Sequence, residues 1–255
     1  MKIAISGKGG VGKTTLAALL ARHLTETGRQ VIAVDADPNA NLALALGVPP
    51  DKVPTPISEM QELIEERTES KKGYGTYFKI NPHVDDIPEK YCLRLGRLRL
   101  LVLGGVRSGG AGCICPESAL LKALVTHLLL GRDDVVILDM EAGIEHLGRA
   151  TAEAVSVMIV VVEPGARSLE TARTIRRLAG EIGIPRVAAV INKLPPGMSI
   201  APLEKALEGL PVLGVLPYDE AVLKADIENR SPFTGAPAQM KLLEGLVAAL
   251  ARQEA

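Results

Sequence analysis

The feature that most constrains the fold is a glycine-rich segment between a short apolar run and a helix-forming run. Residues 7–15 read GKGGVGKTT, with Ile3–Ile5 before them and Leu16–Leu20 after them. Glycines let consecutive backbone N–H groups turn toward one anion, and the positive end of the helix dipole adds to the attraction. The segment matches G-x-x-x-x-G-K-[ST] in its required strand–loop–helix setting, and therefore predicts a triphosphate cradle. The expected phosphate-binding residues are Gly9, Gly10, Val11, Gly12, Lys13, Thr14 and Thr15.

Two side chains in this loop favour a nucleoside triphosphate over a dinucleotide. Gly7, Gly9 and Gly12 also spell G-x-G-x-x-G, so an NAD oxidoreductase, which would bind NAD(H) in place of ATP, is an alternative. That fingerprint has no use for a Lys-Thr pair entering the helix, because backbone groups alone hold its pyrophosphate. We expect Lys13 to reach the β- and γ-phosphates and the Thr14 hydroxyl to bind Mg²⁺.

Short apolar runs alternate with helix-forming segments along the whole chain. The runs are continuously apolar, which is typical of parallel strands covered on both faces. We therefore predict an α/β fold, a doubly wound and mostly parallel sheet with helices on both faces and ligands at the carboxyl ends of the strands. The expected strands are Lys2–Ile5, Val31–Val34, Leu98–Leu103, Val135–Leu138, Val157–Val162, Val187–Ile191 and Val212–Leu216. The expected helices are Lys13–Glu26, Glu117–Leu130, Ser168–Ile182 and Met240–Ala251.

No linker is long enough to divide the chain, so residues 1–255 are predicted to form a single P-loop ATPase domain. Residues 49–90 are the least regular part, and we expect a surface insertion there with one helix around Ser58–Thr68. The 47% hydrophobic content is enough for a large core.

Composition also limits the partners. A net charge of −1 and 2% aromatic residues argue against a broad nucleic-acid surface. Met1 leads directly into the first strand without a signal peptide, and the longest apolar run, Val157–Val162, is too short to span a bilayer. Three cysteines do not make a disulfide framework. We expect a cytoplasmic protein with reduced thiols, and neither nucleic acid nor membrane among its partners.

Carboxylates follow two of the expected strands. Asp35 and Asp37 come after Val31–Val34, and Asp139 comes directly after Val135–Leu138. At the carboxyl end of a strand such a group lies near the neighbouring phosphate loop, where it can orient the attacking water or bind Mg²⁺. Asp139 fits a Walker B magnesium ligand. Asp35 fits equally well as a residue that caps a turn.

A second glycine-rich segment carries two of the three cysteines. In extended backbone the side chains of Cys113 and Cys115 point the same way, so their thiolates could hold one ion. A soft-metal site usually has four ligands, which two copies of the loop would supply in a symmetric dimer. Packing cysteines or a redox dithiol are the alternatives, although C-x-x-C spacing is absent. Cys92 fits a small buried hydrophobe.

Lys8, directly after the first glycine, resembles the extra lysine of the deviant Walker A loop in the MinD, ParA and nitrogenase-iron-protein class of ATPases. The resemblance implies that Lys8 reaches the nucleotide of the other subunit in a face-to-face dimer; a solvated loop lysine is the alternative. Within that class, four segments are similar to the CooC/AcsF ATPases, maturation factors for carbon monoxide dehydrogenase and acetyl-CoA synthase. These segments are GKGGVGKTT (7–15), DADPNANLALALG (35–47), GAGCICPE (110–117) and DMEAGIEHLGR (139–149).

This resemblance implies specific roles. Nickel, or zinc in its place, would be held between two subunits by Cys113 and Cys115 of each, in a nucleotide- and metal-dependent homodimer that serves a nickel-enzyme client. Asp37 would position the attacking water near Mg²⁺. Lys8, Lys13, Asp37 and Asp139 are then the expected catalytic residues, with Thr14, Asp37 and Asp139 around Mg²⁺. Asn192 and Lys193 would recognise the base of ATP or ADP, although a plain turn is an alternative, and Pro217, Tyr218 and Asp219 would pack the adenine.

Two further members of the class differ from this chain. The second cluster cysteine of the nitrogenase iron protein would fall near His146, where this chain has no cysteine, so a shared [4Fe–4S] cluster is disfavoured. His146 could be a spare metal ligand, a hydrogen-bonding residue or a helix-start residue. MinD-type positioning ATPases need a basic amphipathic C-terminal helix, whereas Leu243, Leu246, Val247 and Leu250 form an apolar stripe typical of a core-facing helix. An iron–sulfur ATP-dependent reductase is the other alternative.

Overall fold

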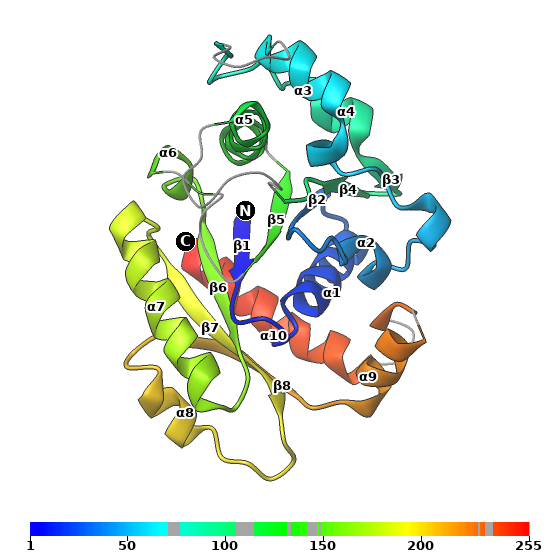
Figure 1. Cartoon of the computed structure of the whole chain (residues 1–255). Helices are drawn as coiled ribbons and strands as arrows, with labels where there is room; N and C mark the ends of the chain where they lie inside the picture. Colours follow the sequence, from blue (N-terminus) through cyan, green and yellow to red (C-terminus); the bar gives the residue numbers. More distant parts are fainter. Residues whose placement is uncertain are drawn as a thin grey trace.

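A computed structural model describes residues 1–70, 77–105, 115–131, 134–141, 147, 149–228, 230–232 and 237–254. Its centre is an eight-stranded sheet with the order β3-β4-β2-β5-β1-β6-β7-β8 (Figure 1). Neighbouring strands are parallel except for β3 and β4. The strands are β1 (Lys2–Ser6), β2 (Val31–Ala36), β3 (Leu93–Leu95), β4 (Leu98–Val102), β5 (Val135–Met140), β6 (Val157–Val162), β7 (Val187–Leu194) and β8 (Val212–Pro217). The predicted doubly wound α/β fold is confirmed.

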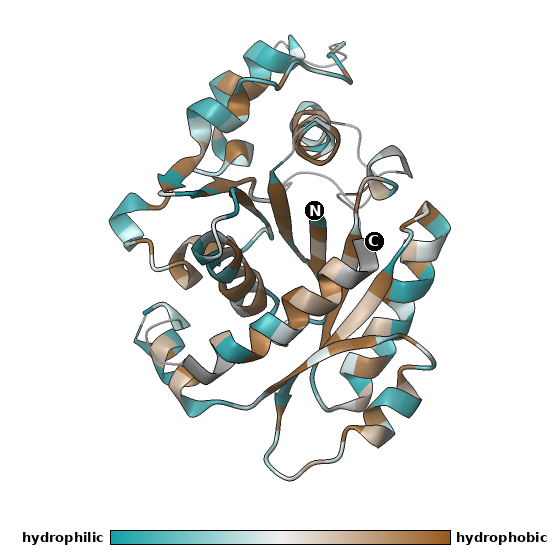
Figure 2. Ribbon diagram, turned by 180° about the vertical axis from the view of Figure 1, so that it is seen from behind, coloured by the Kyte–Doolittle hydropathy of each residue, from teal (hydrophilic) through white to brown (hydrophobic). Residues whose placement is uncertain are grey.

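The central strands are mostly apolar because helices cover both faces of the sheet. Every residue of β1, β2, β5 and β6 is buried. One face packs against α1 (Lys13–Glu26), α2 (Leu42–Ala45) and α10 (Pro237–Glu254), and the other against α5 (Pro116–Leu130) and α7 (Ala166–Ile182). Figure 2 shows the strands as an apolar layer and the helices with hydrophilic residues facing outward.

All seven expected strands and all four long helices are present, with ends that differ by a few residues. The sequence patterns missed the short elements. These are β3, α4 (Ile87–Tyr91), α6 (Arg149–Ala152), α8 (Ala201–Ala206), α9 (Glu220–Ile227) and α2. Each is too short for a helical or alternating period to stand out from a turn.

The part of residues 49–90 that the structure describes is more regular than expected. The single helix predicted at Ser58–Thr68 is two elements, a 3₁₀ turn η2 (Ile57–Glu59) and α3 (Gln61–Thr68), preceded by η1 (Pro50–Lys52). Met60 separates them with a non-helical backbone (φ −85°, ψ 75°). Arg67 on α3 makes two hydrogen bonds of 2.8 Å to Asp86, the residue before α4. These bonds hold α3 to the start of α4, and α3 also packs against α5.

The C-terminal helix α10 buries its apolar stripe in the core. Leu243, Leu246 and Leu250 are at most 2% exposed, and Val247 packs against the same cluster. Among the helices described, none is long and apolar enough to cross a bilayer.

Candidate nucleotide site

The phosphate loop follows β1 at the carboxyl edge of the sheet, between β5 and β6. Two of its glycines, Gly7 and Gly12, are required by close approaches. A Cβ on Gly7 would lie 2.4 Å from the carbonyl oxygen of Val161, and one on Gly12 would lie 2.4 Å from Nδ2 of Asn192. Gly12 also has a φ of +95° directly before α1, a conformation that favours glycine. The sequence motif thus corresponds to a backbone that other residues would not fit.

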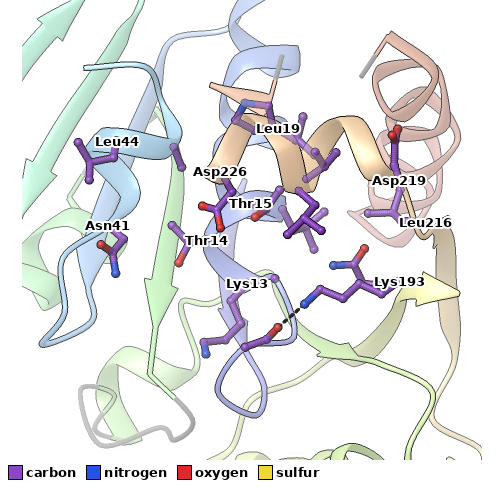
Figure 3. A pocket seen from close by; sticks show the side chains of 18 of the residues that line it. Lys13, Thr14, Thr15, Leu19, Asn41, Leu44, Lys193, Leu216, Asp219 and Asp226 are labelled. Atoms are coloured by element: carbon purple, nitrogen blue, oxygen red, sulfur yellow. Dashed lines mark hydrogen bonds between the residues drawn. The ribbon is translucent and has the colours of Figure 1, made fainter. Parts of the chain in front are cut away.

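A cavity of about 630 Å³ opens along this loop and the first two turns of α1 (Figure 3). Four segments far apart in the sequence line it: the loop with α1, the turn after β2 with α2, the end of β7, and the end of β8 with α9. The lining includes the predicted Gly9, Gly10, Gly12, Lys13, Thr14, Thr15, Asp37, Asn192, Lys193, Pro217, Tyr218 and Asp219. Val11 is buried behind the loop. The fold therefore brings these residues together, while their individual roles remain predictions.

The two lysines of the loop have different surroundings. Lys13 is 7% exposed, and its Nζ lies 3.4 Å from the carbonyl oxygen of Lys8, to which it donates. Lys8 is not among the residues that line the cavity, and its Nζ lies 3.8 Å from Oε1 of Glu163, the residue after β6. About 40% of the Lys8 side chain is exposed, so it can exchange this partner for another.

Asp139, at the end of β5, is a buried carboxylate beside the phosphate loop. It is 1% exposed, and neither oxygen accepts a hydrogen bond from the described residues. Burial raises its pKa to about 6, and Asp37 adds to the rise, while the Thr14 hydroxyl and the Lys13 charge oppose it. Buried carboxylate oxygens without donors are free to bind a cation, and oxygen ligands are what Mg²⁺ prefers. Thr14, Asp37 and Asp139 therefore fit a magnesium site.

Asp35, opposite Asp139 in the β2–β5 ladder, is fully buried but has donors. Its two oxygens accept the backbone N–H of Leu42 at 2.8 Å and of Asp37 at 3.3 Å. Burial raises the pKa of Asp35 to about 7. The hydrogen bonds from Leu42 and Asp37 lower it, and the nearby charge of Asp139 raises it further. Of the two interpretations of Asp35, capping fits this geometry, because its side chain closes the turn between β2 and α2.

Two side chains at the end of β7 form hydrogen bonds to the backbone of the phosphate loop. Nδ2 of Asn192 donates to the carbonyl of Val11 at 2.8 Å. Nζ of Lys193 donates to the carbonyl of Gly10 at 2.6 Å, the dashed line in Figure 3. Lys193 has a φ of +56°, unusual outside glycine. This pair therefore shapes the loop itself, a function that the expected base recognition did not include.

Sequence reasoning missed the far wall of the cavity, formed by α2 and α9. Asn41, Leu44, Asp226 and Arg230 line it, and Figure 3 labels Asn41, Leu44 and Asp226 among the side chains around the cavity. The sequence signal that could have predicted α9 was Asp219, a residue type that commonly caps helices. Its carboxylate accepts the N–H of Ala221 at 2.9 Å, directly before α9.

Of the candidate metal ligands, Cys113 and His146 lie outside the described residues. Cys115 is half-buried and immediately precedes α5, where its Sγ accepts the backbone N–H of Ser118 at 3.4 Å. Cys92 packs against the core as predicted, but it is half-buried and not fully buried. The described residues alone contain no group of three or more His, Cys, Asp or Glu placed to hold a metal ion.

A parallel sheet with a glycine-rich phosphate loop, a Lys-Thr pair and a buried carboxylate on the adjacent strand defines a P-loop nucleotide-binding protein. Residues 2–233 match the model of the CobQ/CobB/MinD/ParA nucleotide binding domain. The chain belongs to this family and is an ATPase of the CooC type.

Relatives and solved structures agree with this assignment. The carbon monoxide dehydrogenase accessory protein CooC of Rhodospirillum rubrum is 45% identical over 98% of this chain and 96% of its own length. An uncharacterized ATP-binding protein of Methanocaldococcus jannaschii is 49% identical over 89% of this chain and 88% of its own. The MinD cell division protein of Aquifex aeolicus shares the fold, with a TM-score of 0.67 at 19% identity over 98% of this chain and 95% of that one.

Proposed function

We propose that this ATPase is a nickel metallochaperone. It dimerises around a Cys113–Cys115 metal site and helps to insert nickel into the active-site cluster of a carbon monoxide dehydrogenase or acetyl-CoA synthase. The observation that carries the proposal is the position of Cys115. It begins α5 at the carboxyl edge of the sheet, the edge that also holds the phosphate loop, and the chain is 45% identical to a carbon monoxide dehydrogenase accessory protein.

In the ATPase reaction, water attacks the γ-phosphate and gives ADP and phosphate. Lys13 and the loop N–H groups hold the phosphates, and Asp37 orients the attacking water. Thr14, Asp37 and Asp139 would hold Mg²⁺, which neutralises phosphate charge when bound. Lys8 leaves Glu163 and reaches the phosphates bound by the partner subunit.

The rest of the cavity takes the nucleoside. Pro217, Tyr218 and Asp219 at the end of β8 pack the adenine, beside the Asn192 amide. Asp226 lines the same cavity and would accept hydrogen bonds from ribose hydroxyls, as the acidic residue of dinucleotide-binding folds does.

The transported ion is a substrate of the dimer. Two thiolates per chain leave an ion coordinatively unsaturated, so four thiolates from two chains are needed for a closed site. The backbone N–H of Ser118 donates to the Cys115 sulfur and orients it, as hydrogen bonds around metal ligands commonly do.

A positioning ATPase that binds membranes through its last helix is the less favoured function. In α10 the apolar side chains Leu243, Leu246 and Leu250 are buried against the sheet. They would have to leave the core before they could enter a lipid surface.

The proposal is tested by the metal content of anaerobically purified protein loaded with Ni²⁺ or Zn²⁺. We expect one ion per two chains in the wild type, loss of that ion in Cys115→Ala, and retention in Cys92→Ala, the matched control. One ion per chain, or equal binding by Cys115→Ala, would contradict the shared site. An iron–sulfur absorption band would instead indicate a reductase.

A further inference from the structure

The short helix α2 ends in a turn that satisfies two of its carbonyl groups and passes over a third. Gly47, with a φ of +80°, donates its N–H to the carbonyl of Leu44 at 2.8 Å. The N–H of Val48 donates to the carbonyl of Ala43 at 3.0 Å. This pair of hydrogen bonds commonly ends a helix and favours glycine at the left-handed position. It does not reach the carbonyl of Ala45, the last residue of α2.

A serine near the other end of the chain supplies a donor for this carbonyl. Oγ of Ser231 donates to the carbonyl of Ala45 at 3.1 Å, across 186 positions of sequence. A Cβ on Gly47 would lie 3.2 Å from Cβ of Ser231, so the serine lies directly against the end of α2. Ser231 is half-buried, and Pro232 after it is buried. The hydroxyl therefore caps α2 through a long-range contact.

The end of α9 fixes the position of this serine. The N–H of Glu228 donates to the carbonyl of Lys224 at 3.1 Å, and the N–H of Arg230 donates to that of Ala225 at 2.7 Å. The second bond closes the last turn of the helix directly before Ser231. Within α9 only Ala225 is buried, so apolar packing holds this helix weakly. The bond from Ser231 to α2 therefore contributes much of what fixes the end of α9.

The two joined helix ends belong to the far wall of the nucleotide cavity. α2 follows the turn that carries Asp37, and α9 follows the expected adenine loop at the end of β8. Ser231 itself is not among the lining residues. The residues of this wall that line the cavity include Leu44 and Ala45 on α2, Asp226 on α9, and Arg230 and Pro232 on either side of Ser231.

We propose that Ser231 is a positioning residue for the bound nucleotide. Its hydroxyl holds α9 against α2 and keeps the nucleoside half of the cavity, the part lined by the end of β8 and by α9, in shape. The inference rests on the proposed placement of the nucleoside there, and on no metal site. The phosphates are expected on other groups, Lys13 and the loop N–H groups. Loss of the hydroxyl should therefore weaken binding of the nucleoside and leave binding of the phosphates unchanged.

The test compares Ser231→Ala with Ser199→Ala in the full chain. Ser199 is exposed and does not line the cavity, so it is the matched control. Calorimetric titration measures the affinity for ADP, and for inorganic triphosphate as a probe of the phosphate loop alone. Ser231→Ala should bind ADP about 2- to 10-fold more weakly, the net value of one hydrogen bond, and triphosphate as the wild type does. The control should bind both ligands normally.

Two further variants separate positioning from loss of structure. Ser231→Thr keeps the hydroxyl and should bind ADP as the wild type does. The double variant Gly47→Cys, Ser231→Cys places two Cβ atoms at 3.2 Å, close to the roughly 3.5–4.5 Å of a disulfide. Once oxidised, with the bond verified by peptide mass spectrometry, it should release ADP more slowly than the same protein reduced. Gly47→Cys alone measures the effect of a side chain at that backbone position.

Equal losses of ADP and triphosphate binding in Ser231→Ala would indicate general loss of structure and overturn the positioning role, as would unchanged ADP binding. Asn192→Ala, which loses a bond to the phosphate loop, distinguishes this inference from the placement of the nucleotide. If Asn192→Ala weakens both ligands and Ser231→Ala weakens neither, the cavity assignment stands and the role of Ser231 is wrong. If neither variant changes ADP binding, both the assignment and the role are wrong. No metal enters these measurements, so the metallochaperone proposal is tested separately.

Discussion

At the scale of single residues, Asp139 combines deep burial with oxygens that accept no hydrogen bond from the described chain. Its pKa is about 6 in the folded protein against an ordinary value of 3.8, so the folded state keeps the proton to a higher pH than the unfolded state. The free energy of unfolding therefore falls as the pH rises from the ordinary pKa of 3.8 to about 6. Above that range the full cost of burying the charged carboxylate is present.

This predicts that Asp139→Asn stabilises the nucleotide-free protein, on the order of 1–3 kcal/mol near neutral pH. Thermal melts should show a larger gain near pH 8 than near pH 5, because the carboxylate it replaces is charged only at the higher pH. Glu62→Gln, at an exposed position on α3, is the control. Added Mg²⁺ and ATP should stabilise the wild type but not the variant. An equal gain at both pH values would mean that charge burial is not the cause.

The ion pair between Lys8 and Glu163 gives a second prediction at this scale. Both side chains are partly exposed, so the pair contributes only about 0.2–1 kcal/mol. Glu163→Gln should leave the melting temperature nearly unchanged and release Lys8, which strengthens ATP-dependent dimerisation by at most about fivefold for each of the two chains. Lys8→Ala should weaken dimerisation and turnover while the local phosphate loop stays intact. Sedimentation with ATP measures the dimerisation of both variants. Normal dimerisation of Lys8→Ala would refute the cross-subunit role.

At the scale of elements, the long strands and helices were predictable from the sequence, and the short helices and turns were not. The run Val135–Leu138 predicted β5 because a strand buried on both faces has an apolar residue at every position. The phosphate loop was predictable because its backbone demands glycines at fixed spacing. The second wall of the cavity was not, because α2 has four residues and α9 eight, and Asp226 belongs to no motif. The hydrogen bonds of Asn192 and Lys193 were equally hidden, since they join residues more than 180 positions apart.

The contact between β7 and the phosphate loop leads to a prediction about that pair of elements. Asn192→Ala removes the donor to Val11 and loosens the loop, which should weaken ATP and ADP binding alike by about 2- to 10-fold, the net value of one hydrogen bond. Because the loss is uniform, kcat should change less than KM. Calorimetric titration with each nucleotide, with Gln61→Ala on α3 as control, measures the effect. A loss confined to ATP would instead place Asn192 near the γ-phosphate.

At the scale of the whole molecule, the carboxyl edge of the sheet collects the phosphate loop, the turn after β2, the end of β5 and the start of α5 (Figure 1). Topology predicts this gathering, since parallel strands present their carboxyl ends on one side. A second chain meeting this edge would place Lys8 and Cys115 at the same interface. Metal and nucleotide would then act on one dimerisation equilibrium.

Such a shared equilibrium predicts that Zn²⁺ stabilises the protein only as a dimer. A free ion concentration of 100 times the dissociation constant stabilises the folded, metal-bound dimer by about 2.7 kcal/mol. The melting temperature should therefore rise with Zn²⁺ and also with protein concentration, because each ion needs two chains. Scanning calorimetry over a wide range of protein concentration tests this, with Cys115→Ala expected to lose both effects and Cys92→Ala to keep them. A Zn²⁺ effect that does not vary with protein concentration would place the whole site in one chain and rule out the shared thiolates.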